Sequence, residues 1–365
     1  MCGPDGYRHY MLKEIHEQPR VVADALGTMI NSATGRPALP NFPELKRASR
    51  LLMAACGTSY YAALAGKYMF EKLARLPVEV ELASEFRYRE PVLVPERTAL
   101  FISQSGETAD TLAALRLCRE AGLSLLSIVN VTDSSMARES HAILPTLAGP
   151  EIGVASTKVF TAQLTILSAL ALALASHRGF ITEREEARLT RVLGETPAAM
   201  AAILADAGSI KALARDLVAP AKSAIFLGRG PSFPIALEGA LKLKETSYIH
   251  AEGYAAGEFK HGPMALVDET MPIIALAPSD SLFPKIASNL AEINALGGRT
   301  IFIGDAAGLA RVSGLAGHIL LPETDPFTIP LVYSLPVQLL AYHAAVARGA
   351  DVDQPRHLTK SVTAE

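Results

Sequence analysis

The segment FISQSGETADT, residues 101–111, combines residue types that suit phosphate binding. It begins as an apolar strand and continues as a polar turn before a helix. Ser103, Ser105 and Thr108 offer hydroxyls there, and Gln104 offers an amide. The first N–H groups of a helix are unpaired and carry partial positive charge, so such a turn can hold a phosphate without a lysine. An ordinary helix N-cap, where Ser and Thr are common, is the alternative interpretation.

Two shorter polar turns are candidates for the same ligand site. CGTSY (56–60) is another strand-to-helix turn, where Ser59 either caps its helix or meets the ligand. Considered alone, capping is the better explanation. GVASTK (153–158) brings Ser156 close to the start of an apolar helix, as a third and less specific ligand loop.

Ionisable residues crowd into a second segment, LEGALKLKETSYIHAEGYAAGEFKHGP. Glu238, Lys242 and Glu245 follow one another at helical spacing, so they share one face of a helix. Small residues at 255–257 allow chain segments to approach closely. Such a cluster suits general acid–base chemistry, in which neighbours tune His and Glu. The alternatives are a surface ion pair on the helix and a structural or idle His261 in KHGP.

Lys360 and Cys2 are the remaining candidates. Lys360 is either a solvated terminal lysine or, if the tail folds over a site, an amine for a Schiff base. Met-Cys-Gly is similar to the start of an N-terminal-nucleophile amidotransferase. Because no domain follows that would supply an oxyanion hole, we interpret Cys2 as an inert remnant.

The elements that position these residues are arranged as an internal repeat. Residues 51–73 and 224–245 each combine a short apolar strand, a glycine-containing turn and an amphipathic helix. Each half continues with two further strand-like runs and a similar His-to-Pro marker at 141–145 or 318–322. The further runs are 98–103 and 123–130 in the first half, and 271–277 and 299–305 in the second.

Helical patterns such as 111–122 and 283–297 separate these strands. Alternating strands and helices imply βαβ units and parallel sheets, and the apolar strands suit burial on both faces. We therefore predict an α/β fold of two similar parallel sheets flanked by helices. The predicted parts are a helical segment and loop (1–44), a first α/β domain (45–175), a helical linker (176–214), a second α/β domain (215–348) and a tail (349–365) that closes over the active site.

Composition narrows the function classes. Of the 365 residues, 50% are hydrophobic and 19% are charged, which is typical of a folded protein. A net charge of −3 disfavours a general nucleic-acid-binding protein. Three cysteines and no C-x-x-C spacing indicate a reducing compartment without disulfides or a metal site. The most apolar run, 162–175, is too short to span a bilayer, so we expect a cytoplasmic protein without membrane contact.

Together these motifs identify a family. The chain resembles, over nearly its whole length, the isomerase portion of glutamine–fructose-6-phosphate aminotransferase, also called glucosamine-6-phosphate synthase. The matching segments are ACGTSY, ELASEFRYR, SQSGETADTL, EIGVASTK, FLGRG, ALEGALKLKE, YIHAE, KHGP, QLLAYH and DQPR. In combination they are far more specific than any one motif.

The resemblance implies two sugar isomerase (SIS) domains and a sugar-phosphate substrate, with no cofactor and no metal. It assigns the phosphate group to Ser103, Gln104, Ser105 and Thr108, and the lining of the sugar site to Ser59 and Ser156.

The resemblance also implies the catalytic roles. Glu245 moves a proton between C1 and C2, and Lys242 is a site lysine one turn before it. Lys360 forms a Schiff base with the open-chain ketose. His261 opens the sugar ring and reaches the site of a neighbouring subunit, so a homodimer is expected.

The predicted function is interconversion of fructose 6-phosphate and glucosamine 6-phosphate with free ammonia, as a synthase isomerase domain or a deaminase. A plain fructose-6-phosphate/glucose-6-phosphate isomerase and a non-catalytic sugar-phosphate-sensing SIS module are the alternatives. The family's glutaminase domain is not in this sequence, so a separate glutaminase partner is a further possibility.

Overall fold

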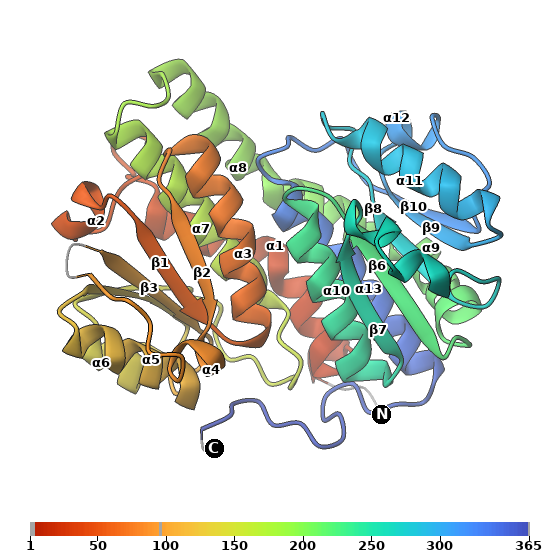
Figure 1. Ribbon diagram of the computed structural model, residues 1–365, viewed down its shortest axis with the longest axis horizontal. Coiled ribbons are helices and arrows are strands. Elements are labelled where there is room, and N and C mark those ends of the chain that lie inside the picture. Colours follow the sequence, from red (N-terminus) through yellow and green to blue (C-terminus); the bar gives the residue numbers. More distant parts are fainter. Residues whose placement is uncertain (1–3, 95–96, 364–365) are drawn as a thin grey trace. The chain divides into compact units, whose positions relative to one another are not determined.

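The computed structural model describes residues 4–94 and 97–363, and these divide into two compact units (Figure 1). Unit 1 comprises Met1–Pro19, Ile152–Thr157 and Thr196–Leu358. Unit 2 comprises Arg20–Glu151, Lys158–Glu195 and Thr359–Glu365. Cys2, interpreted above as a remnant, lies outside the described residues.

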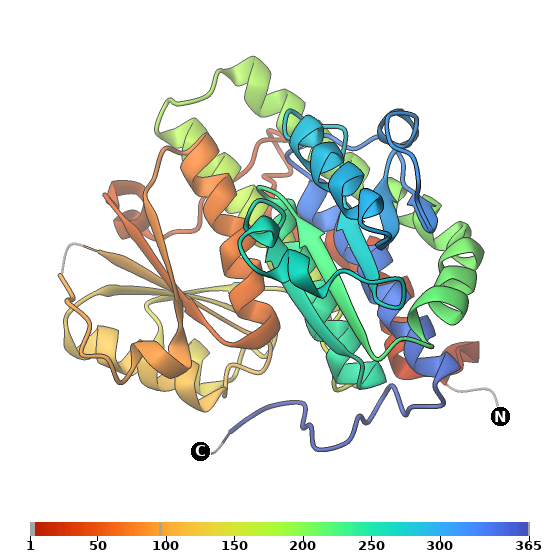
Figure 2. The same ribbon diagram turned by 45° about the vertical axis from the view of Figure 1, so that its right-hand side comes forward.

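Unit 2 is built on a parallel sheet of order β2-β1-β3-β4-β5. Its strands are β1 (Leu51–Ala55), β2 (Val78–Leu82), β3 (Thr98–Ser103), β4 (Ser124–Val129) and β5 (Ala142–Pro145). Its helices include α2 (Pro43–Arg47), α3 (Gly57–Leu73), α4 (Ala83–Phe86), α5 (Ala109–Glu120), α6 (Ser135–Glu139) and α7 (Lys158–His177). In Figures 1 and 2, α4, α5 and α6 lie on one face of this sheet and α3 and α7 on the other. Because both faces are covered, every residue of β1 and β3 is buried.

Unit 1 repeats the arrangement in a sheet of order β7-β6-β8-β9-β10. Its strands are β6 (Ser223–Gly228), β7 (His250–Ala255), β8 (Pro272–Leu276), β9 (Arg299–Gly304) and β10 (Gly317–Leu320), all parallel. Its helices include α9 (Ala207–Leu213), α10 (Ser232–Ser247), α11 (Phe283–Ala295), α12 (Ala306–Leu309) and α13 (Ile329–Ala347). The equal strand order confirms the predicted α/β fold with an internal repeat.

Short helical turns and two long helices complete the described chain. The turns are η1 (Pro4–Gly6), the π-helical η2 (Ala214–Val218), η3 (Glu258–Lys260) and η4 (Pro263–Leu266). The long helices α1 (Tyr10–Met29) and α8 (Glu183–Ala205) each contribute to both units.

The four edge strands of the described sheets, β2, β5, β7 and β10, were not predicted as strands; β5 and β10 coincide with the His-to-Pro markers at 141–145 and 318–322. The sequence of β2, VEVEL, alternates apolar and acidic residues with the period of a half-buried strand, so the signal was present. β7 carries His250 and Glu252, so its residues were interpreted as part of the acid–base segment and not as a strand. Edge strands are harder to find from apolar runs because they are less buried than central strands.

Two described helices are long and apolar enough to cross a membrane by length and composition alone, or three if the bent pair 183–205 and 207–218 counts as one span. They are α7 and α13, and 94% and 89% of their apolar windows are buried inside the protein. The prediction that the run 162–175 is too short to span a bilayer is wrong, since its helix extends over 20 residues. The burial of α7 agrees with the predicted core helix.

One half-buried histidine on α13 makes the stability of unit 1 depend on pH. Burial, together with the positive charges of Lys211 and His16, lowers the pKa of His343 from 6.5 to about 4. Between these pH values the unfolded chain binds a proton at His343 that the folded chain does not. The folded state is therefore expected to lose stability as pH falls from about 6.5 to 4.

We expect His343→Gln to reduce this loss, because Gln binds no proton in either state. The measurement is Tm between pH 4 and 7.5, with the exposed His318 replaced by Gln as control. Equal pH dependence in H343Q and the unchanged chain would contradict the prediction.

Candidate active site

The hydroxyl-rich loop after β3 is folded by its own side chains. Ser103 Oγ accepts a hydrogen bond from the Gly106 N–H at 3.0 Å and lies 3.0 Å from Thr108 Oγ1. Ser105 Oγ accepts from the Glu107 N–H at 3.1 Å. The four predicted phosphate residues, Ser103, Gln104, Ser105 and Thr108, thus lie in one tight turn at the carboxyl end of a central strand. Ligands of open α/β sheets bind at such strand ends.

A glycine is needed at position 106 for two reasons, the local backbone conformation and the lack of room for a side chain. Its φ is +65°, and a Cβ at this position would lie 2.0 Å from Ser134 Oγ. The loop is also tied to the start of α6, since the Ser135 N–H donates to the Glu107 carboxylate at 2.6 Å and the Met136 N–H donates to the Gly106 carbonyl at 3.1 Å. The turn is therefore held in one shape.

Side-chain capping, the alternative interpretation for these turns, does not describe them. Thr108 is the N-cap residue of α5, but its side chain makes no capping hydrogen bond. Cys56, not Ser59, is the N-cap residue of α3. Ser59 lies in the first turn of α3, where its hydroxyl accepts a hydrogen bond from Gln163 Nε2 of α7 at 3.0 Å.

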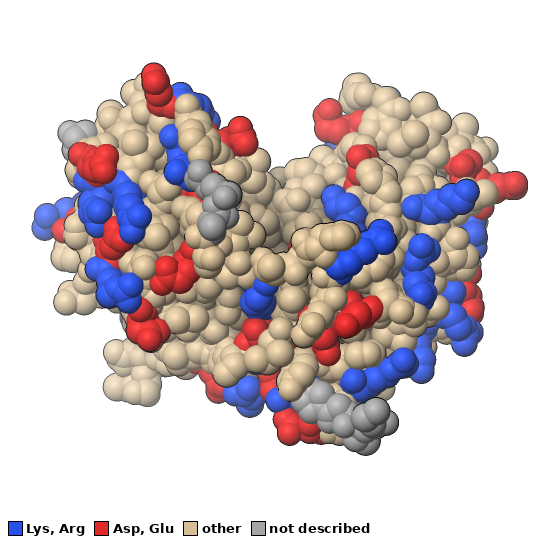
Figure 3. Space-filling model, turned by 90° about the horizontal axis from the view of Figure 1, so that it is seen from below, with Lys and Arg blue, Asp and Glu red and all other residues tan. Residues whose placement is uncertain are grey.

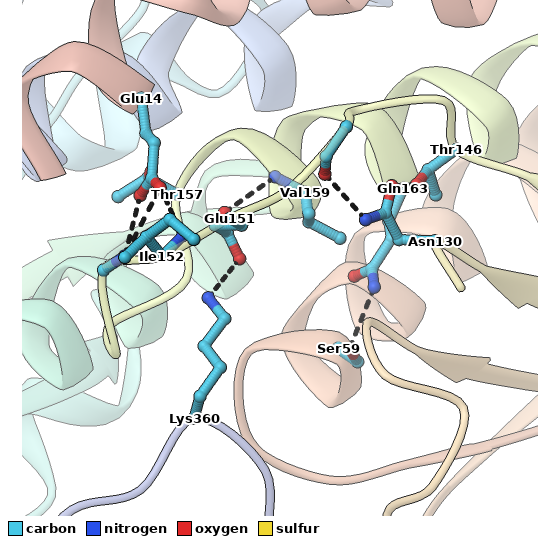
Figure 4. Close-up of polar contacts among 12 residues, drawn as sticks. Glu14, Ser59, Asn130, Thr146, Glu151, Ile152, Thr157, Val159, Gln163 and Lys360 are labelled. Carbon is cyan, nitrogen blue, oxygen red and sulfur yellow. Dashed lines mark hydrogen bonds and ion pairs between the residues drawn. The ribbon is translucent and has the colours of Figure 1, made fainter. Parts of the chain in front are cut away.

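The tail of unit 2 lies against this loop. The Ala109 N–H, at the start of α5, donates to the Val362 carbonyl at 3.0 Å. Ser361 Oγ lies 2.9 Å from Ser105 Oγ. Lys360 Nζ lies 2.5 Å from Glu151 Oε2, and Figure 4 shows the lysine pointing toward this carboxylate. Within unit 2, the structure thus brings Lys360 and the predicted phosphate loop together.

The charged face of α10 is buried. Lys242 Nζ lies 2.5 Å from Glu245 Oε2 and 3.5 Å from Glu238 Oε1. The side chains of Lys242 and Glu238 are 1% and 0% exposed, whereas that of Glu245 is 22% exposed. The surface ion-pair interpretation is therefore wrong. A buried ammonium between two carboxylates is costly unless it is well paired, and Glu245 is the member that solvent or a ligand can reach.

The rest of the predicted acid–base cluster is dispersed over unit 1. His250 and Tyr254 both contact Glu252 on β7. Lys260 pairs with Glu292 of α11 at 2.6 Å. His261 follows η3 and is exposed. The ionisable residues that crowd together in the sequence thus lie in different places: some form surface pairs, some form the buried group on α10, and His261 is exposed.

Ser156 belongs to a short segment of unit 1, residues 152–157, and is half-buried. The buried Glu14 carboxylate accepts hydrogen bonds from the N–H groups of Ile152 and Gly153. The Val154 N–H donates to the Asp353 carbonyl at 3.0 Å. The backbone on which Ser156 lies is therefore fixed by its neighbours.

The equivalent loop of unit 1, after β8, lacks the features of a phosphate site. Asp280 Oδ1 accepts from the Leu282 N–H next to the start of α11, so a carboxylate lies where an anion would bind. A cavity of about 730 Å³ beside this loop is lined by Asp280, Asp305, Glu323 and Asp325 among others. Burial opposes ionisation of Asp305, but hydrogen bonds from Ser279 and Gly308 hold its pKa below the ordinary value. The negative charge here disfavours phosphate.

Three polar residues of unit 2 that contact the candidate site residues Lys360, Ser59 and Ser105 were not among the predictions. Glu151 lies at the start of EIGVASTK, and Gln163 lies on the apolar helix that follows it. Glu107 lies inside the phosphate motif itself. A buried polar residue is visible in sequence only as an exception within an apolar run, and Gln163 offered that signal.

Among the described residues no group of three or more His, Cys, Asp or Glu side chains could hold a metal.

Acidic and basic side chains are intermixed on the face shown in Figure 3.

Comparisons with known proteins agree on one family. A family model described as "SIS domain" matches residues 44–173 and 217–348. Glutamine–fructose-6-phosphate aminotransferase [isomerizing] of Zymomonas mobilis is 54% identical over 367 residues, which cover 100% of this chain and 60% of that protein. This chain therefore spans less than two thirds of that relative's length.

Solved structures give the same result. The C-terminal domain of glucosamine-fructose-6-phosphate aminotransferase from Francisella tularensis matches with a TM-score of 0.93 and 44% identity, covering 97% of this chain and 100% of that one. A glucosamine-6-phosphate deaminase from Thermotoga maritima matches with a TM-score of 0.75 over 97% of this chain and 99% of its own. At 24% identity, the second match shows a shared fold alone.

We expect Gly106→Ala to destabilise the protein more than Gly149→Ala, by about 1–3 kcal/mol. Both glycines have positive φ, at +65° and +67°, so both substitutions strain the backbone, but only Gly106 has an atom in the way of a Cβ. Denaturant unfolding of the two variants measures the difference. Equal losses would mean that Ser134 moves aside without cost.

Proposed function

The chain belongs to the SIS domain family, and on that premise we propose that it interconverts fructose 6-phosphate and glucosamine 6-phosphate. The reaction would use a Schiff base between the ketose and Lys360, followed by proton transfer between C1 and C2. Nitrogen would enter or leave as ammonia, which is either free or supplied by a glutaminase. No cofactor or metal is part of the proposal.

The observation that carries the proposal is the tail. Lys360 is followed directly by Ser361 and Val362, which contact Ser105 and Ala109 of the proposed phosphate site. An amine for imine formation and donors for a phosphate group therefore meet within one unit. A sugar phosphate has the two functional groups, a carbonyl and a phosphate, that such a pair would hold.

The proposed steps follow from the residues. The loop hydroxyls of Ser103, Ser105 and Thr108, the amide of Gln104 and the first turn of α5 would bind the phosphate. Ser59 and Ser156 would line the sugar site. Lys360 would attack the carbonyl carbon, and the imine would make the neighbouring C–H easier to deprotonate.

Glu245 would move the proton between C1 and C2, because it is the accessible carboxylate of the buried group on α10. Lys242 would hold this carboxylate in place through their 2.5 Å contact. In a homodimer, His261 would open the ring of the sugar that is bound to the second copy. Its exposure on a loop supports a role toward another chain.

We propose SIS domains at 45–175 and 215–348, with 1–44 preceding them, 176–214 as linker and 349–365 as a tail over the active site. We also propose a cytoplasmic location, which the small number of cysteines supports.

The test is incubation of the protein with glucosamine 6-phosphate, followed by proton NMR of the sugars and an ammonia assay. Fructose 6-phosphate together with ammonia is the expected result. If a parallel sample converts fructose 6-phosphate to glucose 6-phosphate without releasing ammonia from the amino sugar, the chain is a plain isomerase. If neither sample reacts, the sensing module is the better description.

We expect Glu245→Gln to lower turnover by about 10²–10⁴-fold with little change in substrate affinity, because Gln keeps the shape of Glu but accepts no proton. Glu195→Gln, which alters an exposed ion pair with Arg191, is the control for loss of a carboxylate. Exchange of the C2 proton with solvent deuterium provides the readout. Unchanged exchange in E245Q would remove Glu245 from the mechanism.

A further inference from the structure

Glu151 is a fully buried carboxylate whose two oxygens have different partners. Oε1 accepts a hydrogen bond from the Val159 N–H, in the first turn of α7, at 3.1 Å. Oε2 lies 2.5 Å from Lys360 Nζ. The Glu151 side chain is 0% exposed, while that of Lys360 is 24% exposed (Figure 4). One oxygen is thus anchored to a long buried helix, and the other faces the amine.

This geometry is unusual for a lysine in a tail. Lysines near chain ends are normally solvated, and exposed ion pairs contribute little to stability. Here the carboxylate has no contact with solvent, and taking a charge out of water is costly unless a partner is held close. The position of the carboxylate is also set by α7 rather than by the tail. The Glu151 side chain can therefore act on Lys360 from a fixed place.

We propose that Glu151 is the proton-transfer partner of Lys360 in imine formation, an inference that rests on the proposed function. When a carbonyl carbon reaches Lys360, the ammonium gives one proton to Glu151 Oε2 and becomes a neutral amine. The nitrogen lone pair then forms the C–N bond, and the carbonyl oxygen takes up the second nitrogen proton and becomes a hydroxyl.

Glu151 next returns its proton to that hydroxyl, which leaves as water while the nitrogen lone pair forms the C=N bond. The product is a protonated imine beside an ionised carboxylate, so atoms and charges balance and no other reagent is needed. The transfer is physically reasonable because it turns a buried ion pair into two neutral groups at the moment when a substrate displaces water.

The experiment is trapping of the imine. The full chain is incubated with fructose 6-phosphate and cyanoborohydride, which reduces a protonated imine, and mass spectrometry follows the modified peptide that contains Lys360. Glu151→Gln keeps the size of the side chain and a hydrogen bond to Lys360 but accepts no proton. We expect trapping to be about 100-fold slower in E151Q, with a changed pH profile because solvent must then accept the proton.

A matched control separates this role from a structural one. Glu186 is another buried carboxylate of unit 2, 4% exposed, whose oxygens bind Arg36 at 2.7 and 2.8 Å. Glu186→Gln therefore removes the charge of a buried, paired carboxylate at a place distant in sequence from the proposed chemistry, and trapping should keep its rate and pH profile. Glu151→Asp retains a carboxylate and should recover part of the rate lost in E151Q.

The outcomes distinguish this inference from the proposed function. If the unchanged chain is labelled at Lys360 and E151Q is labelled equally fast with the same pH profile, the role of Glu151 is overturned. If the unchanged chain turns over sugar phosphate but is never labelled at Lys360, the Schiff base itself is overturned. If E151Q and E186Q lose labelling equally and in proportion to lost secondary structure, Glu151 is structural and the inference fails.

Discussion

The side-by-side alignment of β1 and β3 is the constraint on which the site of unit 2 depends. Ala55 lies opposite Ile102, so both strands end at the same edge of the sheet. The chain runs from β1 to one neighbour, β2, and then crosses to the other, β3, which leaves the two following loops adjacent at the point where the order reverses. The phosphate turn follows one strand and the start of α3, with Ser59, follows the other. Every residue in both strands is buried.

The same constraint acts in unit 1, but the side chains there differ. Its strands have the same order, yet the loop after β8 carries Asp280 in place of a hydroxyl-rich turn, and carboxylates line the adjacent cavity. It has instead a buried ion-pair group on α10, where Lys242 is held by two glutamates. A repeated architecture thus supports two different chemical environments. The strand order determines where the loops meet, but it does not determine which residues the loops contain.

Much of this was predictable because buried parallel strands leave a strong pattern. The apolar runs at 51–55 and 98–103 and the repeat between the halves were sufficient to predict two parallel sheets. The edge strand β2 was missed although VEVEL alternates regularly, since an edge strand has no apolar run. For the site, hydroxyl density marked the turn at 103–108, and helical spacing marked Lys242 and Glu245. Sequence spacing could not predict that Lys260 and His250 pair elsewhere, or that Glu151 meets a lysine far along the chain, because those contacts depend on tertiary packing.

The contacts of the tail also set an order of events. Ser361 and the Val362 carbonyl engage Ser105 and the Ala109 N–H, which are two of the donors that a phosphate group would use. A dianion entering the turn would compete with these neutral acceptors, and the segment that carries Lys360 would be loosened by the same event. Binding of the anion and rearrangement of the tail around Ser361 and Val362 would then be one coupled step. A sugar without a phosphate group could not displace these tail contacts. The site would therefore select phosphorylated sugars before any bond to carbon forms.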